Sequence, residues 1–259
     1  MIRALHSSAA GMQAQQLSLD VIANNLANVQ TTGFKKSKIE FQDLLYQSTR
    51  TAGANQGGDN QLPTGLQVGH GAQPVATAKI FTTGELTATD EQWDVAIQGD
   101  GFFKVILPSG EFAYTRDGAF KRNSFGALTT SDGLALDGGL VIPEGARSVD
   151  ISPGGQVSIV TADGTEQLEL QLHRFPNPAG LESMGRNLYR TTDASGEAVQ
   201  GNPNDQGFGA LAQGYLEKSN VKVIEEMVNM IVTQRAYEVN SKSVQAADEM
   251  MEITNNLRR

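Results

Sequence analysis

Residues 2–26, IRALHSSAAGMQAQQLSLDVIANNL, open the chain with apolar and small side chains alternately three and four positions apart. This spacing places one narrow stripe along a helix, as in helices that supercoil with a partner. The members of the stripe are Ile2, Leu5, Ala9, Met12, Gln16, Leu19, Ala23 and Leu26. Because a single helix cannot bury such a stripe, the sequence predicts a partner helix.

The other end of the chain repeats the pattern. Its stripe consists of Val232, Ala236, Val239, Ser243, Ala246, Met250, Ile253 and Leu257. The first helix should run to about residue 30, where Thr31, Thr32 and Gly33 favour its end. The second should run from about residue 220 to the C-terminus. We call the two stripes together the terminal seam, and expect it to join these helices to each other or to other copies of the chain.

Composition narrows the class of protein. The 259 residues include 28 glycines and no cysteine, and the formal net charge is −9. Negative charge without a basic run argues against nucleic acid as a partner. No apolar run approaches the roughly 18 residues of a membrane span, so we expect no membrane insertion. His6, Ser7 and Ser8 interrupt any signal-peptide core near the N-terminus.

The region after the first helix changes character twice. Residues 34–46 combine basic and apolar side chains and could form a short amphipathic segment, while residues 47–71 are Gly, Asn, Gln and Thr with few apolar positions. The second stretch cannot bury enough surface to offset its chain entropy, so we expect a flexible polar arm. The basic cluster Lys35, Lys36 and Lys38 is interpreted as a solvated face or an ion-pair partner between subunits.

The centre of the chain reads as short antiparallel strands. Period-two patterns predict strands over residues 75–81, 94–98, 102–107, 112–115, 157–160 and 168–175. Asp-Gly pairs between them suit tight turns. We therefore predict an α+β fold with a discontinuous coiled coil of terminal helices and a central antiparallel domain, sandwich- or barrel-like. The expected domains are residues 1–33 with 220–259, the connecting segment and arm 34–72, and the β domain 73–219.

Enzyme chemistry finds no support in the residues. His6, His70 and His173 are far apart, and the motifs of metalloproteases, nucleotide-binding loops and serine hydrolases are missing. The Asp-Gly pairs lack the spaced ligands of a calcium loop. We expect no catalytic residue, no cofactor and no metal. A secreted β-domain binding module, oligomerised by its ends, remains an alternative.

Four motifs then resemble one known family, the bacterial flagellar rod and hook proteins. ANNLANVQTTGFK (residues 23–35) is similar to their N-terminal signature and QRAYEVNSK (234–242) to their C-terminal one. DVAIQGDGFF (94–103) and YTRDG (114–118) match the centre. Within the family, the length and the segments 62–69 and 213–221 favour the distal-rod branch. A proximal rod or hook subunit is the alternative.

The resemblance implies a helical tubular homopolymer that acts as a drive shaft, transmitting torque from motor to hook. Its implied partners are further copies of itself, the proximal rod protein, the hook protein, the surrounding P- and L-ring proteins and the flagellar export apparatus. Its implied location is the basal-body rod crossing the periplasm, after export without a cleaved signal peptide. The polar arm would pack between neighbouring subunits.

Two sets of residues are predicted to carry assembly. The polymer interface would include the terminal seam and the asparagine cluster, namely Ile2, Leu5, Ala9, Met12, Leu19, Asn24, Asn25, Leu26, Asn28, Val232, Ala236, Val239, Ala246, Met250, Ile253 and Leu257. The inter-subunit arm would include Leu62, Pro63, Gly65 and Leu66.

Overall fold

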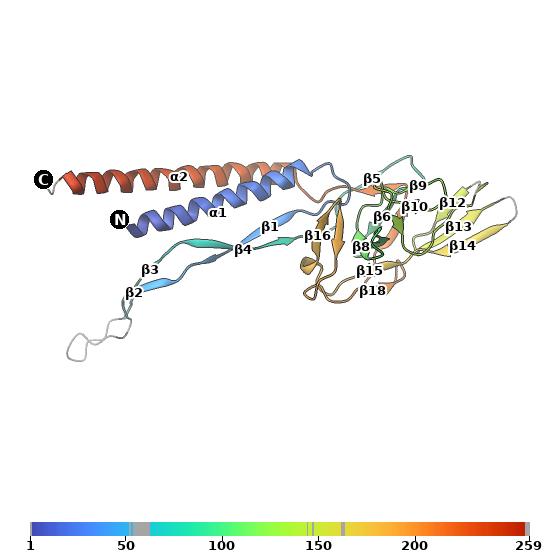
Figure 1. Cartoon of the computed structure of the whole chain (residues 1–259), viewed down its shortest axis with the longest axis horizontal. Coiled ribbons are helices and arrows are strands. Elements are labelled where there is room, and N and C mark those ends of the chain that lie inside the picture. Colours follow the sequence, from blue (N-terminus) through green and yellow to red (C-terminus); the bar gives the residue numbers. More distant parts are fainter. Residues whose placement is uncertain are drawn as a thin grey trace. The chain divides into compact units, whose positions relative to one another are not determined.

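The computed structural model (Figure 1) describes residues 2–51, 53, 63–143, 145–146, 148–161 and 164–256 of the α+β chain. Contacts divide it into two compact units. The first, here called the helical unit, comprises Met1–Leu26, Ser37–Ala78 and Val223–Arg259. The second, the β unit, comprises Ala27–Lys36 and Lys79–Lys222. The chain therefore passes between the units four times.

The helical unit contains two long helices that run side by side in opposite directions (Figure 1). Helix α1 spans Ile2–Ala27 and helix α2 spans Val223–Asn256. Helix α1 ends about three residues earlier than predicted, and a turn follows in which the Thr31 amide donates to the Asn28 carbonyl. Helix α2 carries Glu225 and Glu226 in its first turn, where carboxylates interact favourably with the helix dipole.

The two helices meet through faces with small and polar side chains. The buried residues are Ala14, Ile22 and Asn25 on α1, and Glu226, Thr233 and Ala247 on α2. Gly11 lies so close to Asn240 that an added Cβ would come within 2.9 Å of the Asn240 side chain. The helix pair therefore uses a face different from the terminal seam that the sequence suggested.

The rest of the helical unit is a β ribbon. Strand β1 (Ser37–Asp43) pairs with β4 (Ala72–Lys79), and β2 (Tyr46–Arg50) pairs antiparallel with β3 (Leu66–Gly69). Residues 34–46 thus contain strand β1 where a short amphipathic segment was expected, and the described part of residues 47–71 contains paired strands where a flexible arm was expected. A polar chain with little to bury is ordered here because the backbone groups of the two strands satisfy one another.

The β unit is built from short strands in small sheets, all paired antiparallel where a register is defined. The largest sheet has seven strands in the order β16-β17-β8-β7-β11-β10-β9. Its strands are β7 (Phe103–Ile106), β8 (Phe112–Thr115), β9 (Lys121–Arg122), β10 (Leu128–Thr129), β11 (Ala135–Leu136), β16 (Glu182–Gly185) and β17 (Leu188–Arg190). Among the described residues no sheet closes into a barrel.

The remaining strands form one three-stranded sheet and three pairs. The sheet contains β12 (Ser148–Ile151), β13 (Gln156–Val160) and β14 (Thr165–Glu169). The pairs are β15 (Leu172–Arg174) with β18 (Val199–Gly201), β19 (Ala210–Gln213) with β6 (Val95–Gln98), and β20 (Tyr215–Glu217) with β5 (Leu86–Ala88). A short 3₁₀ helix covers Pro178–Gly180. The described residues of the β unit form two buried apolar clusters, and the larger one includes the fully buried Ile97, Phe103 and Ile159.

Candidate functional site

Helix α2 presents two chemically different faces. Its inner face carries a residue every seven positions, Glu226, Thr233, Asn240 and Ala247, of which the first, second and fourth are buried. Small and polar side chains here give a close but modest contact with α1. Little of the apolar surface of α2 is used by this contact.

The outer surface of the first turns of α2 is apolar and exposed. Ile224 is 79% exposed and Ile231 is 58% exposed, and Met227, Val228 and Val232 are exposed beside them. Isolated apolar residues on a surface are ordinary, but a contiguous group of this kind marks an interaction site. We call these five residues the α2 apolar surface.

The terminal seam continues from this surface along one flank of α2. Val239, Ala246, Met250 and Ile253 are exposed like Val232, and Ala236 is half-buried. On α1 the seam residues are less exposed: Leu5, Met12, Leu19 and Leu26 are half-buried and Ala9 is exposed. Leu257 and the side chain of Ile2 lie outside the described residues. Because the seam is not the contact between α1 and α2, its assignment to an inter-subunit contact stays a prediction.

The three asparagines of the cluster differ in their exposure to solvent. Asn24 is exposed and Asn28 half-buried, whereas Asn25 is buried in the helical unit. The Asn25 side chain accepts a hydrogen bond from the Ser37 amide and donates one to the Ser37 carbonyl, both at 2.9 Å. It also donates to Glu226 at 3.4 Å. The Asn25 amide therefore joins α1, the start of the ribbon and α2 within one chain.

The ribbon exposes apolar side chains along its length. They are Phe41, Leu45, Tyr46, Leu66, Val68 and Val75, with Leu45 at 88%. The predicted arm residues Pro63, Gly65 and Leu66 are exposed, and Leu62 lies outside the described residues. A lone two-stranded ribbon is only marginally stable in water, so packing against another surface would increase the stability of this ribbon.

A buried ion cluster lies in the β unit, where sequence reasoning did not place one. The Lys35 ammonium contacts Glu217 Oε1 at 2.6 Å, and Arg116 Nε contacts Glu217 Oε2 at 3.1 Å. Lys35 is fully buried and Glu217 is 1% exposed. The interpretation of Lys35 as a solvated or inter-subunit charge is therefore wrong. Its carboxylate partner lies far away in the sequence, and only the fold brings the two together.

The protonation of the cluster follows from its surroundings. Burial and, after it, the charge of Arg116 lower the pKa of Lys35 to about 8, against the opposing effect of Glu217. Burial alone would raise the pKa of Glu217, but Arg116, Lys35 and the Gly84 N–H bring it below its ordinary value. At neutral pH the cluster therefore holds two cations around one carboxylate.

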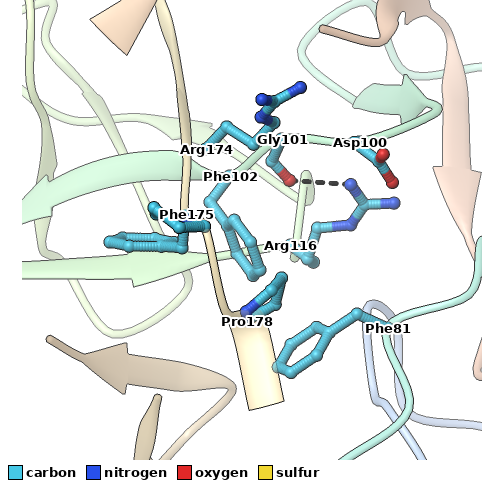
Figure 2. A pocket seen from close by; sticks show the side chains of 9 residues that line it. Phe81, Asp100, Gly101, Phe102, Arg116, Arg174, Phe175 and Pro178 are labelled. Atoms are coloured by element: carbon cyan, nitrogen blue, oxygen red, sulfur yellow. Dashed lines mark hydrogen bonds between the residues drawn. The ribbon is translucent and has the colours of Figure 1, made fainter. Parts of the chain in front are cut away.

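Beside the cluster is a cavity of about 260 Å³ (Figure 2). Phe81, Phe102, Phe175 and prolines 176 and 178 supply its apolar lining, with Asp100 and Arg174 among the polar residues. Figure 2 shows the guanidinium of Arg116 directed to the Gly101 carbonyl, to which it donates at 2.7 Å. Arg116 also donates to the Gly99 carbonyl and to Glu217, so its donors are engaged by the protein itself.

Within the described residues, no group of three or more His, Asp or Glu side chains is placed to hold a metal ion. Neither described helix combines the length and hydropathy required to cross a lipid bilayer. What the described surface offers is exposed apolar area on a helix and a ribbon, which suits contact with protein.

Comparison with known proteins finds the same family over most of the chain. Residues 5–35 match the model "Flagella basal body rod protein", residues 96–159 "Flagellar hook protein FlgE/F/G D1 domain", and residues 212–257 "Flagellar basal body rod FlgEFG protein C-terminal". Several proteins named "Flagellar basal-body rod protein FlgG" are similar over their full length. Identity is 49% to that of Borreliella burgdorferi (100% of both chains), 45% to that of Caulobacter vibrioides (99% and 100%) and 41% to that of Bacillus subtilis (100% of both).

Proposed function

The chain belongs to the family of flagellar hook and basal-body rod proteins, and from that premise we propose that it is a structural subunit of the distal rod. Many copies would form a helical tube that transmits torque from the motor to the hook. The role is mechanical, and the subunit acts through its contacts rather than by catalysis.

The observation that carries this proposal is the exposed apolar surface of the helical unit. The α2 apolar surface and the seam residues Val239, Met250 and Ile253 are left uncovered by α1. Apolar area removed from water contributes about 25 cal/mol per Å². Assembly that covers these surfaces would therefore supply stabilisation that the single chain does not realise.

The ribbon supports the same reading. Apolar side chains such as Leu45 and Leu66 are exposed on a two-stranded element that has little stability alone. Packing between neighbouring subunits would cover them. A ribbon held in this way would resist bending of the tube, which fits a straight and stiff shaft.

Head-to-tail contact is a symmetry that such surfaces allow. The α2 apolar surface and the ribbon are different patches, so a contact between unlike patches would leave one of each free at the ends of every oligomer. Contacts of this kind that do not close a ring generate helical filaments. We therefore propose that the terminal seam and the arm residues Leu62, Pro63, Gly65 and Leu66 contact neighbouring copies.

The finer details of the proposal follow from the family resemblance. We propose residues 1–33 with 220–259 as polymer core, 34–72 as connecting segment and arm, and 73–219 as the central β domain. The proposed partners are the proximal rod protein, the hook protein, the P- and L-ring proteins and the export apparatus. The proposed location is the rod where it crosses the periplasm, reached by export without a cleaved signal.

The experiment that tests the proposal is electron microscopy of the concentrated protein, seeded with isolated basal bodies, beside a variant lacking residues 47–70. The Leu44 amide donates to the Gly71 carbonyl at 2.8 Å, so the deletion rejoins strands whose ends already lie together. Straight tubes from the full chain and curved or absent tubes from the deletion are expected. A monomer or closed small oligomer from the seeded full chain would contradict the proposal.

A further inference from the structure

All four passages of the chain between the units begin or end in three segments of the β unit. Residues 27–36 provide two of them, and residues 79–85 and 217–222 provide one each. Any torque that passes along the backbone from one unit to the other must run through these segments. How firmly they are held to one another therefore matters for a drive shaft.

Glu217 holds the three segments together. Its carboxylate accepts hydrogen bonds from the Lys35 ammonium at 2.6 Å and from the Gly84 amide at 2.8 Å. Its backbone carbonyl accepts one from the Gly33 amide at 2.8 Å. The Lys35 ammonium in turn donates to the Thr82 carbonyl at 2.7 Å. One buried carboxylate thus has partners in both of the other segments.

Asn220 repeats this arrangement three residues later. Its side-chain oxygen accepts from the Lys36 amide at 2.8 Å, and its side-chain nitrogen donates to the Ile80 carbonyl at 2.8 Å. The Ile80 amide also donates to the Lys36 carbonyl at 3.0 Å. The three segments are consequently joined at two levels along their length.

Arg116 fixes this assembly to the body of the β unit. It follows directly on strand β8, donates twice to Glu217, and donates to the carbonyls of Gly99 and Gly101. Thr32 donates to Asp117 at 3.0 Å, and Asn187 donates to the Thr32 carbonyl at 2.9 Å. The segments are therefore tied to the sheet as well as to each other.

We propose that Lys35, Arg116, Glu217 and Asn220 form a torsional lock, which fixes the points where the chain leaves the β unit so that they cannot swivel independently under load. The inference rests on the proposed function and names the device that makes the subunit stiff. Apolar contacts alone would permit sliding, because they are non-directional. Charge-assisted hydrogen bonds in a buried site are short and directional, and their loss leaves buried groups unpaired.

Buried ion pairs are often no more stabilising than apolar residues of similar volume, but they specify geometry in some systems. Removing a member of the lock should therefore lower the stiffness of the filament more than the stability of the folded chain. All four of its members stand in segments already singled out from the sequence: Lys35 in the N-terminal signature, Arg116 in YTRDG, and Glu217 and Asn220 in residues 213–221. The lock gives these distant motifs one shared physical role.

The test compares Glu217→Gln with Glu182→Gln. The control removes the carboxylate of the exposed Arg190–Glu182 pair in the same unit. Filaments of each variant are grown from seeds and imaged, and the persistence length is measured. The proposal expects a several-fold shorter persistence length for Glu217→Gln and an unchanged one for the control. Filaments of Glu217→Gln as stiff as the unmodified protein would overturn it.

Hydrogen exchange in the monomer separates a lock from general unfolding. In Glu217→Gln the amides of Gly33, Ile80 and Gly84 should exchange several-fold faster, while those of Ile97 and Phe103 in the core keep their protection. Equal protection of all five amides in variant and parent would overturn the proposal, whether or not filaments form. Failure of the unmodified protein to form filaments would instead count against the proposed function. If core protection is lost, Lys35→Met, which keeps the Arg116–Glu217 pair, is measured in the same two ways and decides by the same criteria.

Discussion

Shortening two exposed isoleucines of α2 should weaken assembly without affecting the folded chain. The variants are Ile224→Ala and Ile231→Ala, in the α2 apolar surface. Each removes three carbons from a side chain that the single chain leaves mostly in contact with water, at 79% and 58% exposure. The stability of the monomer should therefore change little, whereas contact with another subunit loses apolar area.

The magnitude follows from the exposed fraction. Removing three buried carbons costs about 2.4 kcal/mol, at about 0.8 kcal/mol each. Scaled by the fraction still exposed before assembly, the loss is about 1.9 kcal/mol for Ile224 and about 1.4 kcal/mol for Ile231. Since about 1.4 kcal/mol is tenfold in an equilibrium constant, each variant should raise the critical concentration roughly tenfold or more.

The assay is sedimentation of seeded filaments over a concentration series, with thermal unfolding of the monomer measured beside it. Phe125→Ala is the matched control, because Phe125 is an apolar side chain that is 85% exposed but lies in the β unit, outside the proposed interface. It should leave the critical concentration near that of the parent. If both isoleucine variants assemble at the parental concentration, the α2 apolar surface is not an interface and the reasoning from exposure is wrong.

Three further predictions concern the folded chain. Gly33→Ala should destabilise the β unit by about 1–3 kcal/mol more than Gly133→Ala in chemical denaturation. Both glycines have positive φ, but only at Gly33 would an added Cβ meet backbone atoms, at 2.7 Å. Equal losses of stability in the two variants would contradict this prediction. Burial lowers the pKa of His173 to about 4, so the free energy of unfolding should fall by about 3 kcal/mol as pH drops from 6.5 to 4. His173→Gln should remove most of this pH dependence. An unmodified protein whose stability does not change over this pH range would refute the prediction. Asn25→Ala should lower the free energy of unfolding by about 1–3 kcal/mol and speed hydrogen exchange of the Ser37 amide, because the Ser37 backbone groups lose their partners. An unchanged exchange rate at Ser37 would count against this prediction.

The helices and the antiparallel character of the centre were accessible from the sequence because local patterns determine them. Period-two segments predicted β6, β7, β8 and β13 closely. The predicted strand over residues 168–175 is instead two strands, β14 and β15, which pair with different partners, β13 and β18 respectively. The two-residue strands β9, β10 and β11 carry too few side chains to show a period.

Contacts between distant segments were not accessible in the same way. Of the ribbon, the sequence predicted only part of β4, through the strand over residues 75–81. The pairing of β1 with β4 and of β2 with β3 was missed because it joins segments that carry little local period. The partners Lys35 and Glu217 are 182 positions apart, and no local rule reveals that Lys35 is buried while its neighbour Lys38 is exposed. The terminal seam was recognised as apolar, but which face of α2 meets α1 depends on close approach at small residues such as Gly11.

The measurement that bears most directly on the central claim is a helical reconstruction by electron cryomicroscopy of filaments seeded from the full chain. The account predicts a tube in which Ile224, Ile231 and Val239 of each copy are buried against neighbouring copies and the ribbon lies between subunits. Filaments in which these side chains of α2 face solvent, with contacts made by the β unit alone, would contradict it.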